Sequence, residues 1–214
     1  MSKRLQERLL HRVIKVSGLV AALFLGGCVT EPPMNQNSIC AIFQQYPHWY
    51  WESQRAYVKW GLPVNIQMAM MRQESSFRAD ARPPRQTVMG FIPGPRPTSA
   101  YGYAQATDGT WARYQKSTGA ISADRDQFGD AVDFMGWYAD QANKTLGISK
   151  TDTYDLYLAY HEGLGGYRSG SYRQKPWLMD IAHKVARTAD IYQTQLSRCQ
   201  NTIPKPSNWN QWLK

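Results

Sequence analysis

The chain has 214 residues, long enough for one domain with a hydrophobic core, and its Lys and Arg outnumber its Asp and Glu by nine. Residues 1–27 hold four of these net positive charges, so the rest of the chain keeps a basic excess of five, which suits an acidic polymer. Nucleic acid is not the expected polymer, because no predicted helix carries a basic stripe for phosphates and the N-terminus directs export.

The N-terminus has the pattern of an export signal. Five Lys or Arg precede an apolar run from Val16 to Leu25, which at ten residues is shorter than the ~20 that a membrane-spanning helix needs. The sequence LGGC, which ends at Cys28, resembles the bacterial lipobox, so residues 1–27 are expected to be a lipoprotein signal peptide and Cys28 the lipidated residue. Val29, by resemblance to enterobacterial lipoproteins, implies a lipid anchor at the periplasmic face of the outer membrane. An ordinary secreted protein with a free Cys28 is the alternative.

Residues 28–37 are polar and contain prolines, which is typical of a tether, and residues 38–214 are expected to form a single domain. Two cysteines remain in this domain, Cys40 and Cys199. In an oxidising compartment they have one pairing available, which would join the first helix of the domain to the last. Two buried free thiols are the alternative.

The pattern of apolar residues, prolines and glycines predicts a mainly α domain with few or no strands. Pro47 suits the first turn of a helix, and Gly61 suits a C-terminal stop. No run of alternating apolar and polar residues is bounded by turns, so strands are few. The expected helices are Ser38 to Tyr46, Pro47 to Trp60, a buried helix that starts at Pro63, Thr110 to Thr118, Asp126 to Leu146, Thr153 to Glu162 and Pro176 to Cys199.

Three other segments are predicted to be irregular. Residues 78–100 are rich in proline and arginine, so we expect a long loop with no regular element. The glycines at 163, 165 and 166 are expected to close the preceding helix. Residues 201–214 are expected to form a tail that packs back onto the domain through Trp209 and Trp212.

Glu74 stands near the C-terminal end of the helix that starts at Pro63, which is too apolar to be all surface. The helix dipole and desolvation both disfavour a carboxylate there and raise its pKa. A carboxyl that stays protonated near neutral pH can act as a general acid. The alternative is a solvated surface glutamate, since many helices end in one.

Other common chemistries lack their motifs. The four histidines are scattered, with no second histidine at helical spacing for zinc, and there is no G-x-S-x-G elbow or phosphate-binding loop. We therefore expect neither a metal nor another cofactor. The acidic polymer that an exported protein meets is peptidoglycan, whose stem peptides carry carboxylates.

Three blocks follow one another in a fixed order: ESSF at 74–77, SAYGYAQATDGTW at 99–111 and LAYHEGLGGY at 158–167. As a set, they resemble the soluble lytic transglycosylase (SLT) family and its goose-type lysozyme relatives. The resemblance covers roughly residues 60–170. It implies a lysozyme-like, mainly α domain that acts on the glycan strands of peptidoglycan.

By this resemblance, Glu74 matches the catalytic acid and base, and Ser75 matches the serine beside it, which is expected to bind substrate. Gln105 matches the glutamine that lines the sugar groove, and Tyr160 matches the tyrosine that hydrogen-bonds near the glutamate. Tyr103 stands where the family has leucine, and it either stacks on a sugar face or packs in the core. The other departures from the family pattern are Ala104, Asp108, Gly109, His161 and Glu162.

The family mechanism implies a lytic transglycosylase, which cleaves the MurNAc–GlcNAc β-1,4 bond and forms 1,6-anhydroMurNAc. A muramidase of the goose-type lysozyme kind is one alternative, and it would need Glu162, Asp108 or Asp80 as a base. A non-catalytic peptidoglycan-binding lipoprotein is another. Glu162 itself is expected to be a solvated turn residue rather than a second carboxylate, and an envelope protein partner stays open.

Overall fold

Seven α-helices make up most of the part that the computed structural model describes, residues 30–206, and they belong to one unit that begins at Glu31. The predicted mainly α fold is confirmed. The helices are α2 (Ile39–Gln45), α3 (Pro47–Trp60), α4 (Val64–Ser75), α5 (Asp108–Thr118), α6 (Phe128–Leu146), α7 (Thr153–Ser169) and α8 (Pro176–Cys199). The short elements are the strands β1 (Thr87–Val88) and β2 (Ile92–Pro93) and the 3-10 helices η2 (Ser171–Gln174) and η3 (Gln200–Thr202).

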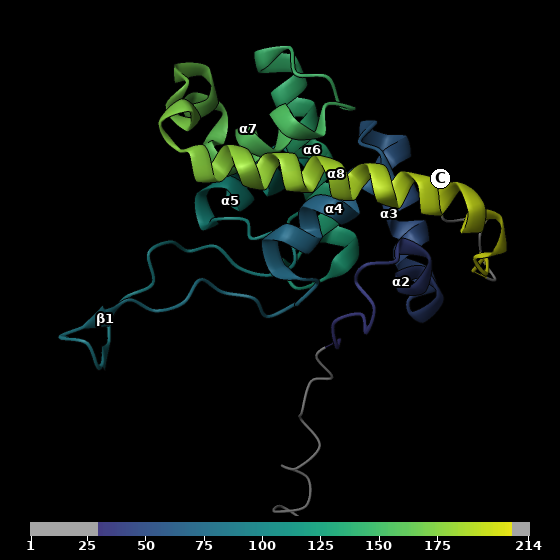
Figure 1. The fold of residues 1–214 in the computed structure, drawn as a ribbon, viewed down its shortest axis with the longest axis horizontal. Coiled ribbons are helices and arrows are strands. Elements are labelled where there is room, and N and C mark those ends of the chain that lie inside the picture. Colours follow the sequence, from purple (N-terminus) through teal and green to yellow (C-terminus); the bar gives the residue numbers. More distant parts are fainter. Residues whose placement is uncertain (1–29, 207–214) are drawn as a thin grey trace, which may run out of the picture. The chain divides into compact units, whose positions relative to one another are not determined.

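Helix α8, with 24 residues, lies across the other helices (Figure 1). Helix α4 packs against α8, α3 packs against α6, and α7 packs against both α6 and α8. Nine of the 12 residues of α4 are buried, including Gln67, whose amide nitrogen donates to the carbonyls of Ser53 (3.1 Å) and Leu62 (2.7 Å). The helix that carries Glu74 is therefore held by the core along most of its length.

The helix ends largely follow their predicted signals. Ser38 caps α2, since its hydroxyl accepts a hydrogen bond from the Ala41 amide at 3.2 Å. Pro47 is the first residue of α3, and Gly61 ends that helix with a φ of 80°. Helix α6 starts two residues later than predicted, because Gln127 still has an extended backbone (φ −95°, ψ 123°).

The prediction that the glycines after Glu162 close α7 is wrong. Only Gly163 leaves the helical conformation (φ 75°, ψ 160°), and the helix resumes and runs to Ser169. Gly165 and Gly166 are accommodated within the helix because a glycine costs only about 1 kcal/mol there relative to alanine. The result is a kinked helix, with Tyr160 and Glu162 just before the kink.

The prediction of a loop without regular structure over residues 78–100 is wrong at its centre. Strands β1 and β2 pair antiparallel, with Val88 opposite Ile92, and the turn between them places Met89 and Gly90 at positive φ. These two-residue strands are too short to show an alternating pattern in the sequence. The hairpin projects away from the helices (Figure 1).

Arginine side chains hold the two arms of this hairpin together. Arg85 donates to the carbonyl of Gly94 at 3.3 Å, and Arg96 donates to the carbonyl of Pro83. At the base of the arms, the guanidinium of Arg82 lies 4.1 Å from the ring centre of Tyr101. The arginines that the sequence places in this loop thus have structural contacts of their own.

The segment before α2 is packed on the domain over residues 31–37, rather than hanging from it as a free tether. The Tyr46 hydroxyl donates to the carbonyl of Glu31 (2.7 Å), and Arg72 donates to the Asn37 side chain (2.6 Å). A disulfide joins Cys40 in α2 to Cys199 at the end of α8, with 6.0 Å between their Cα atoms. The first and last helices of the domain are therefore linked covalently.

Several predictions fall outside the described residues: the signal peptide, lipidation at Cys28, and the packing of Trp209 and Trp212. Within residues 30–206, no helix combines the length and the apolar character that crossing a membrane requires.

Candidate active site

Glu74 lies in the last turn of α4, and its carboxyl faces inward. The residue as a whole is half-buried, but its Oε1 atom is closed off from solvent and has no hydrogen-bond partner among the described residues. An unpartnered buried carboxyl oxygen is rare in a folded protein, because its desolvation is not compensated. Such an atom needs a reason, and a catalytic role is one.

The surroundings of Glu74 favour its protonated form. Burial raises the pKa of Glu74 to about 7, against a smaller opposing effect of a hydrogen bond with Tyr157. Tyr157 is buried in α7, and burial together with the charge of Glu74 raises its own pKa well above the usual value. Near neutral pH, Glu74 can therefore both hold and release a proton, as a general acid and base must.

The second sequence block forms a tight loop that positions Gln105. Tyr101 pairs with Ala106 across the loop, and Gly102 has a φ of 78°, with a would-be Cβ only 2.0 Å from the Arg125 carbonyl oxygen. Only glycine fits there. The Gln105 side chain then donates to the carbonyls of Ala81 (2.9 Å) and Gly102 (2.8 Å), so its orientation is fixed.

Gln105 and Tyr160 line the same cavity, of about 220 Å³, between the second block, α5, α6 and the kink of α7. The Tyr160 hydroxyl donates to the carbonyl of Ala104 at 2.6 Å, which ties the second block to the third. Glu74 does not line this cavity. Tyr160 connects the two, because it lines the cavity and the charge of Glu74 contributes to raising its pKa.

The tyrosine bonded to the acid is not the one that the resemblance indicates. Tyr160 bonds the backbone of Ala104, whereas Tyr157, one turn earlier on α7, forms the hydrogen bond with Glu74. The two tyrosines are three residues apart and so share one face of the helix. That spacing is the sequence signal through which Tyr157 could have been found.

Two residues predicted to bind substrate, Tyr103 and Ser75, do not line the cavity beside Tyr160. Tyr103 is only 1% exposed and packs edge-on against Trp49 (5.7 Å between ring centres) and Phe128 (5.6 Å), so stacking on a sugar is ruled out for it. Ser75 is buried, and its hydroxyl donates to the Met71 carbonyl at 3.3 Å, one turn back in α4. In this arrangement Ser75 supports the helix end and does not line the cavity.

The expectation of a solvated Glu162 is also wrong. Its side chain is 5% exposed, and Lys175 donates to both of its oxygens, at 2.7 and 2.9 Å. Although burial raises its pKa, hydrogen bonds from Lys175, Ser171 and His161 outweigh that effect and lower the pKa of Glu162 to about 2. Glu162 lines the cavity as a fixed, neutralised carboxylate that is poorly suited to accept a proton.

The other two acids considered as a base have partners of their own. Asp108 lies 2.8 Å from the guanidinium of Arg125, and Asp80 lies 3.7 Å from that of Arg78. Both carboxylates are largely exposed, and neither lines the cavity beside Tyr160. No group of three or more His, Cys, Asp or Glu that could hold a metal ion is present in the described residues.

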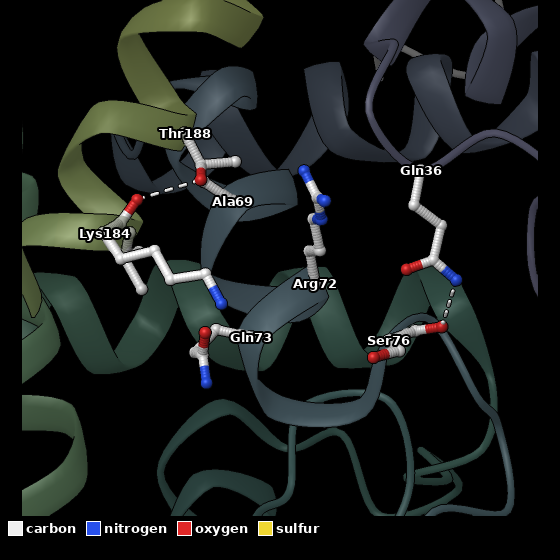
Figure 2. Close-up of a pocket in the computed structure, with 8 residues that line it drawn as sticks. Gln36, Ala69, Arg72, Gln73, Ser76, Lys184 and Thr188 are labelled. Atoms are coloured by element: carbon white, nitrogen blue, oxygen red, sulfur yellow. Dashed lines mark hydrogen bonds between the residues drawn. The ribbon is translucent and has the colours of Figure 1, made fainter. Parts of the chain in front are cut away.

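A second, polar cavity of about 270 Å³ lies between the end of α4 and α8 (Figure 2). Gln73 and Ser76, the close neighbours of Glu74 in sequence, line it together with Lys184 of α8. In Figure 2 the Lys184 ammonium points toward the Gln73 side chain, and Gln36 donates to the Ser76 carbonyl (3.1 Å). The last turn of α4 is thus bordered by this cavity on the α8 side and by Tyr157 of α7.

A mainly α domain with an acid buried at a helix end beside a tyrosine, and with a fixed glutamine in a neighbouring cavity, is of the lysozyme-like type. A family model described as the transglycosylase SLT domain matches residues 16–199, so the chain belongs to this family. No curated protein and no solved structure was found to match. Family membership implies processing of peptidoglycan of the lytic transglycosylase type and binding of peptidoglycan as substrate.

Proposed function

We propose that the protein is a peptidoglycan lytic transglycosylase, which cleaves the MurNAc–GlcNAc β-1,4 bond and leaves a 1,6-anhydroMurNAc end. The single observation that carries this proposal is the place of the Glu74 carboxyl: it is buried, its pKa is raised to about 7, and it lies at the end of α4 beside Tyr157, in the block that resembles the family. A group of this kind can donate a proton to the glycosidic oxygen and take one back later.

The reaction needs one carboxyl only. Glu74 gives its proton to the glycosidic oxygen as the bond to C1 of MurNAc breaks, and the acetamido group of the same sugar stabilises the positive charge at C1. The Glu74 carboxylate then takes the proton of the MurNAc O6 hydroxyl as O6 bonds to C1. The acid is regenerated, and no water is consumed.

The absence of a free second carboxylate in the described part of the cavity favours this route over hydrolysis. An inverting or retaining hydrolase uses a second carboxylate as base or nucleophile, ~5 to 10 Å from the acid. Glu162 is fixed by Lys175, and Asp108 is paired with Arg125 outside the cavity. A muramidase reaction would have to break one of these pairs.

Oε1 of Glu74 is closed to solvent, so a sugar that reacts through this oxygen would have to displace the side chains over it. Gln105 and Tyr160 line the cavity that would receive the sugars, and both are held by hydrogen bonds to backbone carbonyls. Tyr160, whose pKa is raised in part by the charge of Glu74, links this cavity to the acid. Because Gln105 and Tyr160 are held in place, a bound glycan would be oriented for reaction without further ordering of these two side chains.

The cellular location is proposed from the sequence alone. The lipobox-like residues before Cys28 support a lipid anchor, and Val29 supports the outer membrane. In that position the domain would face the peptidoglycan layer. An anchored enzyme of this kind would act in cell-wall remodelling.

The test of the acid is Glu74→Gln, which keeps the shape of the side chain but removes its exchangeable proton. Release of soluble fragments from peptidoglycan sacculi should fall ~10²- to 10⁴-fold, the usual contribution of general acid catalysis. Glu52→Gln is the matched control, because burial also raises the pKa of Glu52 to about 7 while that side chain lies in α3, away from the cavity. Equal activity of Glu74→Gln and the wild type would refute the assignment.

A further inference from the structure

A cavity of about 460 Å³ adjoins the one beside Tyr160, and Arg113 and Tyr138 line both. The adjoining cavity is bounded by the exposed face of α5, by α6 and by the start of the resumed part of α7. Of the residues that line this adjoining cavity, only Leu164 belongs to the three sequence blocks that resemble the family. We call the cavity beside Tyr160 the glycan cavity, after its proposed role, and the adjoining cavity of about 460 Å³ its side chamber.

Two cations border this side chamber. Arg113 and Lys116 are three residues apart on α5 and so lie on one face of the helix, where both are exposed. Among the described residues, neither forms an ion pair, although Arg113 donates to the Thr110 hydroxyl at 3.3 Å. The side chamber has no Asp or Glu among the described residues that line it.

The floor of the side chamber is apolar and rigid. The Tyr138 hydroxyl donates to the Ala159 carbonyl at 2.8 Å, which fixes its ring. Trp137 packs against Tyr114, with 5.6 Å between ring centres, and Leu164 completes the wall beyond the kink. A ligand that suits this surface has an aliphatic stem and a negative charge at its end.

From this chemistry we propose that the side chamber binds the stem peptide of the substrate, with Arg113 and Lys116 holding a peptide carboxylate. The inference rests on the proposed function, because the peptide is carried by the glycan that the neighbouring cavity receives. A peptide branches from MurNAc to the side of the glycan strand, as the side chamber branches from the glycan cavity. Its methyl and methylene groups fit against Trp137 and Leu164.

A glycan has a second source of carboxylate. When an amidase removes the peptide, the lactyl group of MurNAc regains a free carboxylate, which sits close to the sugar ring. That group would have to bind within the glycan cavity rather than in the side chamber. Substrates with and without peptide therefore separate the two sources.

The experiment measures binding in the full-length chain that carries Glu74→Gln, so that cleavage does not interfere. Calorimetry gives the dissociation constants for soluble glycan oligomers that carry stem peptides and for the same oligomers after amidase treatment. We expect the peptide-bearing oligomers to bind roughly tenfold more tightly, the effect of two exposed charge pairs. Arg113→Gln with Lys116→Gln should abolish that ratio, whereas Arg187→Gln with Arg198→Gln, two exposed cations of α8, should retain it.

Three results would overturn the peptide site: equal binding of the two oligomers, a ratio that survives Arg113→Gln with Lys116→Gln, or a ratio that is lost equally in the α8 control. A tighter complex with the stripped oligomer would assign the cations to the lactyl carboxylate. The proposed function is judged separately, by the products of the wild-type chain. A wild type that forms products while the binding ratio stays at one would contradict the peptide site alone.

Discussion

Glu74 and Tyr157 form a coupled pair, and the hydroxyl of Tyr157 tunes the acid. Burial raises the pKa of Glu74 to about 7, and the hydrogen bond with Tyr157 works in the opposite direction. Without Tyr157 the pKa would be higher still. The pair therefore sets the pH at which the acid loses its proton.

Tyr157→Phe should shift the pH dependence of the reaction. General acid catalysis requires protonated Glu74, so the rate falls as pH rises through its pKa, and a higher pKa moves that fall to higher pH. The measurement is kcat/KM against pH on solubilised peptidoglycan. Tyr46→Phe serves as the control, since its hydroxyl bonds the Glu31 carbonyl, away from the acid. A falling limb that stays in place, or moves to lower pH, would disprove the coupling.

The sequence singles out Glu74 as a candidate acid, but it does not predict which side chains surround it. Glu74 is identifiable because a single acid at the end of an apolar helix is conspicuous next to the ESSF block. Tyr103 could not be assigned in the same way, because a tyrosine can equally pack in a core or line a site, and Tyr157 is marked only by its three-residue spacing from Tyr160. The sequence does not predict the burial of Glu162, because Lys175, which neutralises it, is 13 residues away on the far side of the kink.

At the scale of elements, the kink of α7 is the feature that shapes the cavity. Gly163 has a backbone conformation (φ 75°, ψ 160°) that is essentially restricted to glycine. The kink separates Tyr160 and Glu162, which line the cavity of about 220 Å³, from Leu164, which lines the adjoining cavity of about 460 Å³. In a straight α7, Leu164 would take another position relative to Tyr160 and Glu162, and the two cavities would have other walls.

Gly163→Ala should destabilise the fold by ~1 to 3 kcal/mol, the usual cost of a strained backbone conformation. Strain is the only cause expected, because a Cβ at this position meets no atom within 4 Å. Gly165→Ala is the matched control: its Cβ is also unobstructed, but its backbone is helical, so stability should be unchanged or slightly higher. Urea denaturation of both variants measures the difference, and equal midpoints would contradict the role of the kink.

Most helix ends that carry a local signal agree with the sequence prediction, apart from the end of α7, whereas elements held by tertiary contacts were not predicted. Pro47, Gly61 and Cys199 mark helix ends in the sequence and in the structure. The hairpin at residues 87–93 is held by backbone pairing and by Arg85 and Arg96, none of which leaves a periodic pattern. The packing of residues 31–37 on the domain likewise depends on partners far along the chain, such as Arg72.

At the scale of the whole molecule, residues 31–37 and α2 are held to the last helix, α8, by a disulfide and by hydrogen bonds. The Cys40–Cys199 disulfide closes a separation of 159 residues. Residues 31–37 add hydrogen bonds at the same end of the domain, including one from Gln195 of α8 to the Asn37 carbonyl (3.1 Å).

Cys28→Ser should release the protein from the membrane fraction, because it removes the proposed site of lipidation. Fractionation of cells that express the wild type or the variant, followed by immunodetection, gives the result. Cys40→Ser is a useful comparison, since it removes a cysteine of the disulfide but not the proposed anchor. Membrane association that persists in Cys28→Ser would contradict the anchor.

The product of the reaction tests the central proposal most directly. Mass spectrometry of the fragments that the wild-type protein releases from sacculi distinguishes the attack of MurNAc O6 from the attack of water. If Glu74 acts alone on the glycan, each released fragment should end in anhydroMurNAc and be lighter by one water than its reducing counterpart. Fragments with reducing ends would contradict this proposal and indicate a hydrolase, and the absence of fragments would indicate a binding protein.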